Sequence, residues 1–139
     1  MKTAMIIASD AGARTAGIIR EELGKEVDLF SVSERSGCVR IDSITDFTLR
    51  HFGDYEAFVF IGAMGICVRA IAPCVTSKYA DPAVVNVDAT GHFVVSVLAG
   101  HVGGANALTE RLARILGAQP VVTTQSDNTG LWALDLLGK

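Results

Sequence analysis

The segment Ala57–Ile61, with the sequence AFVFI, constrains the fold more than any other part of the chain. An uninterrupted run of apolar residues predicts a strand that is buried on both faces, because a half-exposed strand would alternate with polar residues. Such a strand belongs in the centre of a parallel sheet that helices cover on both sides. Gly62 follows at once, so the chain is expected to turn there toward a helix.

Short apolar runs alternate with helical patterns along the rest of the chain. Strands are predicted at 3–9, 27–32, 84–87, 92–98 and 120–124, and helices at 13–23, 43–53, 66–72 and 102–116. The turn at 88–91 is expected to join two of these strands as a hairpin. The order predicts a single α/β domain over 1–139, with three layers, a mostly parallel sheet, helices on both faces and one β-hairpin. In such sheets ligands bind where strands end and loops lead into helices.

Composition excludes several classes of function. The net charge of −3, with scattered Lys and Arg, argues against binding to nucleic acid or to a membrane surface. The longest apolar runs are about seven residues, well short of the ~20 that cross a bilayer. Cys38, Cys67 and Cys74 lack C-x-x-C spacing, and His51 and His92 lack partners at ligand spacing, so we expect a cytoplasmic protein without disulfides or a protein metal site.

A glycine-rich turn, Gly100–Asn106 (GHVGGAN), separates a predicted strand from a predicted helix. Three glycines within five residues weaken both kinds of element, so a functional requirement for them is expected. Glycines at a helix N-terminus let backbone N–H groups converge on an oxygen anion. His101 lies in this turn, where an imidazole side chain could move a proton. The alternative is a tight turn that packs the helix closely on the sheet, with His101 as a cap.

A second turn of this kind, Gly62–Arg69 (GAMGICVR), follows the central strand. Arg69 lies about one helical turn after Gly65, within reach of a carboxylate that the loop binds. The alternative is an ordinary strand-to-helix turn with a solvated Arg69.

Three further polar segments precede or follow predicted strands. Lys78 and Asp81 stand three residues apart, and a surface ion pair is the simpler interpretation. Asp88 is either a general base or the first residue of the hairpin turn, and local chemistry favours the turn. The segment 123–127 either lines the same crevice as the glycine loops or is simply a loop.

Together these segments resemble the N-terminal region of the cobalamin-biosynthesis hydrolase family that acts on cobalt-precorrin-5A. The matching stretches are GAMGICVRAIAP (62–73), KYADPAVVNVDATGHFVVSVLAGHVGGANALTERLA (78–113) and VVTTQSD (121–127). They stand in the family's order and at its approximate spacing, so the strong match covers 62–127. Residues 1–55 agree with the family only in their pattern of strands and helices.

The resemblance implies a hydrolase of the anaerobic route to cobalamin (vitamin B12). The family opens the δ-lactone formed from a ring A acetate, and the bridging carbon then leaves with its methyl group as acetaldehyde. The substrate is a tetrapyrrole-derived macrocycle ringed with carboxylates, and it carries its own cobalt, so no protein cofactor is expected. Family members of this kind carry a further C-terminal domain that this chain lacks, so the expected partner is a separate C-terminal domain or a second copy of the chain.

Lactone opening requires an activated water and support for a developing oxyanion. On the matching motifs, the resemblance makes His101 or Asp88 the candidate general base and the amides around Gly103 and Gly104 the candidate oxyanion donors. The candidate substrate-binding residues are Gly62, Gly65, Arg69, Lys78, Asp81, Gly100, Gly103, Gly104, Asn106, Thr123, Thr124 and Asp127.

We expect the two glycine loops to form one cradle for the carboxylates of the macrocycle. A non-catalytic corrinoid-intermediate binding module would use the same loops and is the first alternative. A phosphate- or nucleotide-binding domain is the second, and the absence of Walker and G-x-G-x-x-G patterns disfavours it.

Overall fold

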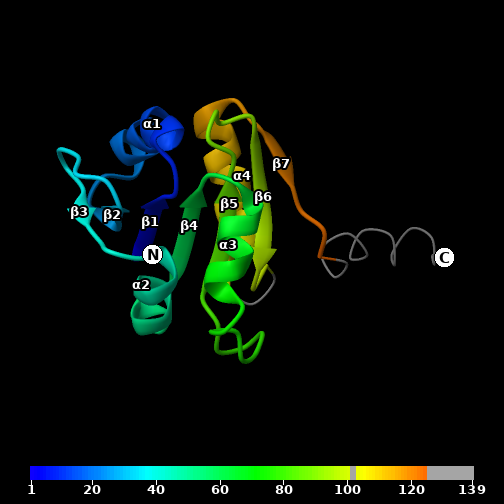
Figure 1. Ribbon diagram of the computed structural model, residues 1–139. Coiled ribbons are helices and arrows are strands. Elements are labelled where there is room, and N and C mark those ends of the chain that lie inside the picture. The colour runs from blue at the N-terminus through cyan, green and yellow to red at the C-terminus, as the bar shows by residue number, and fades with distance from the viewer. Residues whose placement is uncertain (101–102, 125–139) are drawn as a thin grey trace.

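The structure is a computed structural model of the 139-residue chain, and it describes residues 1–100 and 103–124 (Figure 1). The strands are β1 (Thr3–Ile7), β2 (Val27–Ser31), β3 (Val39–Arg40), β4 (Ala57–Ile61), β5 (Ala83–Val87), β6 (Phe93–Leu98) and β7 (Gln119–Val121). The helices are α1 (Ala13–Leu23), α2 (Ile44–His51), α3 (Met64–Ile71) and α4 (Ala105–Leu116), and short 3₁₀ turns lie at Asp10–Gly12 and Gly24–Glu26.

All the strands form one sheet in the order β3-β2-β1-β4-β5-β6-β7. Strands β1 to β5 are parallel, β6 runs antiparallel to β5, and β7 is parallel to β6. The carboxyl ends of β1, β2, β4 and β5 therefore lie at one edge of the sheet, which we call the upper edge. Their amino ends and the carboxyl end of β6 lie at the opposite edge, which we call the lower edge.

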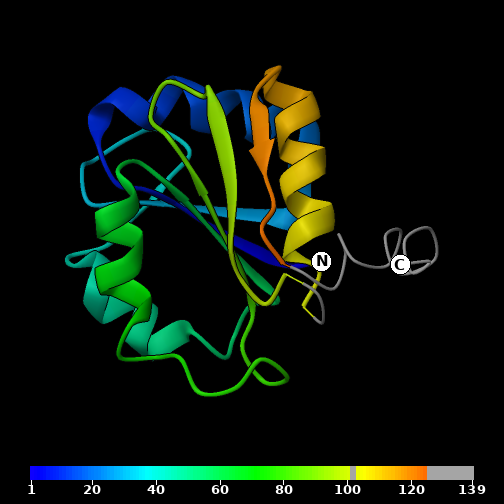
Figure 2. The ribbon, with the colours of Figure 1, turned by 90° about the vertical axis from the view of Figure 1, so that its right-hand side faces the viewer.

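Helices cover both faces of the sheet, and Figure 2 shows α1 and α4 on one side with α2 and α3 on the other. Neighbouring residues of each central strand point to opposite faces, so that Met5 packs toward α1 and α4 while Ile6 packs toward α2 and α3. On β4, Phe58, Val59 and Phe60 are no more than 1% exposed. The three-layer, mostly parallel α/β fold with one hairpin is thus confirmed.

Local signals account for most element boundaries. Ser43 accepts a hydrogen bond from the Asp46 N–H and caps α2, and Gly117 ends α4 in the left-handed conformation. The end of the polar segment 33–40 is a strand that no prediction from the sequence includes, because Val39 and Arg40 pair with Phe30 and Ser31 to form the edge strand β3. No apolar pattern marks so short a strand.

The strand order places a topological switch point between β1 and β4. From β1 the chain moves outward to β2 and β3, then returns to the other side of β1 as β4. The helices that follow β1 and β4 lie on opposite faces, and sheets of this class commonly bind ligands at such a position. Gly62 lies there with φ +153°, and a Cβ at this position would stand 2.8 Å from the Cβ of Ala8.

We expect Gly62→Ala to lower the free energy of unfolding by about 2–4 kcal/mol, because it adds backbone strain and a side-chain overlap. Gly17→Ala is the matched control, since no atom lies within 4 Å of a Cβ there. In the interior of α1 that change should stabilise the protein by about 0.5–1 kcal/mol. Guanidinium denaturation measures both values, and equal stability of Gly62→Ala and the wild type would contradict the close approach.

Candidate functional site

The two glycine loops lie at opposite edges of the sheet, so the expectation that they form one cradle is wrong. Gly62 follows β4 at the upper edge, whereas Gly100 follows β6, which runs the other way. Leu98, at the end of β6, pairs with Val84 near the start of β5. A five-residue strand such as β5 spans about 16 Å, and that length separates the loops.

The upper-edge loop is held in place by neighbouring strands. The Gly62 N–H donates to the Val87 carbonyl (2.9 Å), and the Asn86 side-chain amide donates to the Gly62 carbonyl (3.2 Å). No side chain caps the start of α3, which follows directly. An Arg69 Nη lies 3.4 Å from the position of a Cβ on Gly65, so the guanidinium folds back along the helix toward its N-terminus. The structure brings Gly65 and Arg69 together, and their arrangement suits a carboxylate.

Asp88, at the same edge, closes the hairpin turn. Its carboxylate accepts hydrogen bonds from the His92 N–H (2.8 Å), the Phe93 N–H (2.6 Å) and the Thr90 hydroxyl (2.6 Å). Desolvation alone would raise the pKa of Asp88, but the hydrogen bonds from Thr90, Phe93 and His92 outweigh it, and the pKa lies below its ordinary value. A weakly basic carboxylate with occupied lone pairs suits the turn role better than that of a general base.

We expect Asp88→Asn to lower the free energy of unfolding by about 0.5–1.5 kcal/mol at pH 7, because the neutral amide loses one acceptor and the charge. The folded-state pKa is depressed, so the contribution of the carboxylate is present above its ordinary pKa of 3.8 and is lost as the pH falls through the folded value. Denaturation series from pH 7 to pH 3 should therefore show the two proteins converging in acid. A constant difference at all pH values would contradict this.

Backbone N–H groups of the lower-edge loop donate hydrogen bonds to a carbonyl of the same loop. The Ala99 carbonyl accepts from the N–H groups of Gly103 (3.0 Å) and Ala105 (3.3 Å), so the Gly103 amide is not available as an oxyanion donor. A Cβ at Gly103 would lie 2.8 Å from that of Ala99, and Gly104 has φ +85°. Close packing thus explains Gly103, and the left-handed backbone explains Gly104. The expected roles of His101 and Asp127 fall on residues outside the described parts of the chain.

Asn106, in the first turn of α4, connects three segments at the lower edge. Its Oδ1 accepts from the Ser96 hydroxyl of β6 (2.8 Å), and its Nδ2 donates to the Thr124 hydroxyl beyond β7 (2.6 Å). A Cβ on Gly100 would lie 2.6 Å from the same Oδ1, so only glycine leaves room for this amide. The structure therefore brings Gly100, Asn106 and Thr124 together, as the motif predicts, while Thr123 is exposed.

Lys78 and Asp81 belong to the turn that leads into β5 at the lower edge. Asp81 is buried and accepts hydrogen bonds from the N–H and hydroxyl of Thr76 and from the N–H of Ser77. The exposed Lys78 places its Nζ 5.3 Å from the centre of the Tyr79 ring. Asp81 thus shapes the turn, and Lys78 presents a positive charge on its surface.

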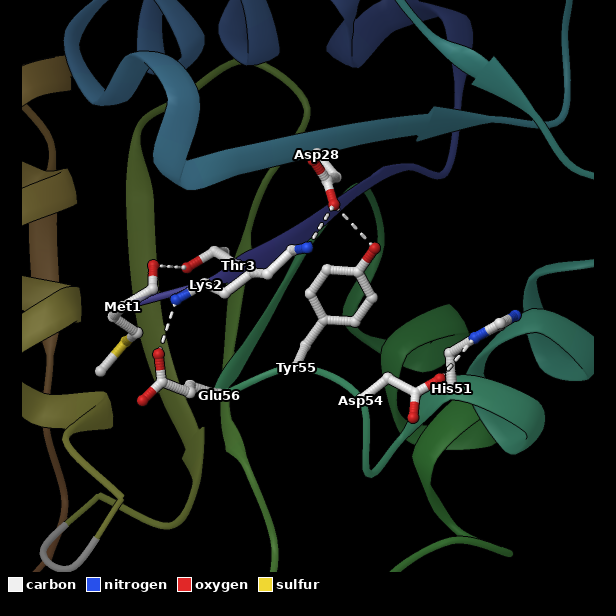
Figure 3. Close-up of polar contacts among 8 residues, drawn as sticks. All are labelled: Met1, Lys2, Thr3, Asp28, His51, Asp54, Tyr55 and Glu56. Carbon is white, nitrogen blue, oxygen red and sulfur yellow. Dashed lines mark hydrogen bonds and ion pairs between the residues drawn. The ribbon is translucent and has the colours of Figure 1, made fainter.

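A further polar cluster ties together the amino ends of β1, β2 and β4 (Figure 3). The Tyr55 hydroxyl donates to Asp28 (2.9 Å), and the Lys2 ammonium lies 3.7 Å from the same carboxylate. Burial, the hydrogen bond to Asp28 and the negative charges of Asp28 and Asp54 raise the pKa of Tyr55 to about 12. The phenol is therefore protonated at neutral pH, and this cluster is a structural tie between strands.

The cysteines are free thiols, as their spacing predicts. Burial raises the pKa of Cys67 to about 12, so this thiol is not a nucleophile at neutral pH. In residues 1–100 and 103–124, no His, Cys, Asp or Glu cluster is arranged to hold a metal ion, and no helix has the length and hydropathy to cross a membrane.

Two residues that organise the loops are missed by motif reasoning. Ser96 holds Asn106, and Asn86 holds Gly62, and both side chains are buried. Each is the single polar residue inside an apolar strand, FVVSVL and AVVNV. A buried polar group needs a partner, so this interruption was the available signal.

We expect Asn106→Ala to lower the free energy of unfolding by about 1–3 kcal/mol, because it leaves the Ser96 hydroxyl without its acceptor in a buried site. Thermal denaturation measures the loss. Ala107→Ser, on the exposed face of the same turn, is the control and should change stability little. Equal stabilities of all three proteins would show that Asn106 does not connect these segments.

The elements and their order define a three-layer α/β domain with one glycine-rich strand-to-helix loop at each edge of the sheet. Residues 46–127 match the family described as "Cobalamin synthesis G N-terminal", which is more than half of the chain. The chain belongs to this family, and the resemblance read from the motifs is confirmed.

Similar proteins agree with this assignment. A cobalt-precorrin-5A hydrolase of Salmonella typhimurium is 56% identical over 86 residues, which are 62% of this chain and 24% of that protein. One of Priestia megaterium is 48% identical over 88 residues, covering 63% and 24% of the two chains. The crystal structure of a cobalamin biosynthesis protein G homolog from Sulfolobus solfataricus superposes with a TM-score of 0.70 at 26% identity, covering 88% of this chain and 36% of that one. The chain spans about a quarter of the length of the curated relatives it matches.

Proposed function

We propose that this chain is the N-terminal part of a cobalt-precorrin-5A hydrolase, which opens the δ-lactone of its substrate and releases acetaldehyde. The observation that carries the proposal is the family match over 46–127, because that range contains both glycine loops. The 56% identity to a protein named for this activity supports it. The cobalt arrives with the substrate, and the reaction takes place in the cytoplasm.

The lower edge is the better candidate for the lactone chemistry. Hydrolysis adds a water oxygen to the lactone carbonyl, and the intermediate then expels the ring oxygen, which takes up a proton. The Asn106 network joins β6, α4 and Thr124 beside Gly100. His101 follows Gly100 in the sequence, and its imidazole would accept the water proton and return it to the leaving oxygen. Lys78 lies at the same edge and would attract a peripheral carboxylate.

The upper edge is proposed to bind other carboxylates of the macrocycle. Gly65, Arg69 and the uncapped start of α3 face a site at which an anion is favoured. Asp88 lies at this edge with its acceptors occupied, so His101 rather than Asp88 is the proposed base. A further domain or a second copy of the chain would supply the remaining contacts to the substrate.

Acetaldehyde release from cobalt-precorrin-5A tests the proposal, with the chain alone and with the chain joined to the remaining part of the Salmonella relative. We expect His101→Ala to lower turnover about 10²- to 10⁴-fold while substrate binding, followed by the macrocycle's absorbance, is kept. Asp88→Asn and the control His51→Ala, at a half-buried histidine on α2, should turn over like the wild type.

Full turnover by His101→Ala would rule out His101 as the base. Binding without acetaldehyde in both forms of the protein would favour the corrinoid-binding module, which the same loops would serve. Neither binding nor turnover in either form would contradict the hydrolase proposal itself.

A further inference from the structure

A cavity of about 410 Å³ lies beside α1, outside both glycine loops. Ile7 and Leu29, from β1 and β2, form part of its lining, and the connection from β2 to β3 closes it from the side. The cavity exists because α1 covers only part of this face of the sheet, and the polar connection covers the rest. Its volume falls within the range of about 300–1,000 Å³ that is usual for ligand pockets.

Gly17, on the cavity side of α1, has no structural reason to be glycine. Its backbone is helical, and apart from its chain neighbours and the backbone of its own helix, no atom of the described chain lies within 4 Å of a Cβ placed there. A glycine in a helix interior destabilises the helix relative to alanine. Gly12 and Gly62 differ, because a Cβ at either would overlap Ile61 or Ala8. The space above Gly17 is therefore free for an atom that does not belong to this chain.

Two arginines reach this cavity from different elements. Arg20 of α1 donates to the Gly37 carbonyl (2.8 Å) and holds the β2–β3 connection in place. Arg35, within that connection, pairs with Asp10 through one Nη, and its Nε is buried without a hydrogen-bond partner. A buried donor without a partner is uncommon, and Nε with one Nη is a pair of donors that a carboxylate can bridge.

Asp10 shows that the Arg35 guanidinium accepts a carboxylate. The Asp10 side chain is 79% exposed and also receives a hydrogen bond from the Ser33 hydroxyl (3.3 Å). An exposed ion pair of this kind contributes little stability, so a ligand carboxylate can displace it. Glu34 also lines the cavity, so with Asp10 it opposes the two arginines and limits the affinity for any anion.

We propose that this cavity is a binding site for a carboxylate-bearing small molecule, with Arg35 as the anchor, Asp10 as the displaceable competitor and Gly17 as the wall against which the ligand body packs. Identification of that ligand with an acetate or propionate side chain of the macrocycle rests on the proposed function. The site would then hold the substrate at the upper edge, on the side of β1 away from β4.

An NMR titration of the ¹⁵N-labelled chain tests the site, with uroporphyrin, a metal-free tetrapyrrole bearing acetate and propionate groups, as the probe. We expect the Arg35 Nε–Hε signal and the Gly17 amide signal to shift together. Arg35→Ala should weaken this binding about 10- to 100-fold, and Asp10→Asn should strengthen it up to about fivefold. Gly17→Leu should block binding, whereas Gly17→Ala, which adds only a methyl group, should fold and bind.

Arg50→Ala is the matched arginine control, because Arg50 pairs with Asp46 on α2, across the sheet. It should bind like the wild type, and equal losses in Arg35→Ala and Arg50→Ala would overturn the site. Chemical-shift changes confined to 62–69, with no change in the Arg35 and Gly17 signals, would also overturn it.

Sodium acetate alone serves as a second probe, and binding of acetate as tight as that of the porphyrin would show that the cavity does not recognise the ligand body. Because acetaldehyde release is assayed separately, failure here leaves the hydrolase proposal intact.

Discussion

The reversal of the chain at the hairpin after β5 decides which loops of this domain can act together. Asp88 accepts the backbone N–H groups of His92 and Phe93, and this turn sends β6 back along β5. The loop that follows β6 therefore opens at the lower edge, while every loop that follows β1 to β5 at a strand's carboxyl end opens at the upper edge. A substrate that contacts both glycine loops must extend around the domain, or a further domain must bring the other contacts.

Glycine serves different physical needs at different positions in this fold. At Gly62 and Gly103 a side chain would overlap a neighbouring alanine, so these residues allow close approach of backbone segments. At Gly100 the missing side chain makes room for the Asn106 amide. At Gly17 a side chain would meet no such neighbour, and the open space there belongs to the cavity beside α1. Counting glycines in a motif cannot separate these cases, whereas the contacts of each position can.

Single polar residues inside apolar strands position the loops at both edges. At the upper edge the Asn86 side chain of β5 donates a hydrogen bond to the Gly62 carbonyl. At the lower edge the Ser96 hydroxyl of β6 donates a hydrogen bond to the Asn106 side chain. A buried hydrogen bond of this kind is directional, so it fixes the loop more sharply than apolar packing would. The two edges are therefore rigidly joined through β5 and β6, which carry these residues and pair along their length.

The sequence by itself determined the layers of this protein, most of its elements and its family. The strand Ala57–Ile61 is apolar on both faces, so helices had to cover both sides of the sheet. Glycines and capping residues marked the ends of helices. These signals can be read from the sequence because each involves residues that are close together in the chain. The expectation of a shared cradle treats both glycine loops as following parallel strands, and the antiparallel β6 makes this wrong. Only the tertiary structure decided that Gly103 donates to Ala99, that Arg35 faces a cavity beside α1, and that Gly17 faces open space. Each of these depends on contacts between segments that the strand order brings together, and an apolar pattern does not encode that order.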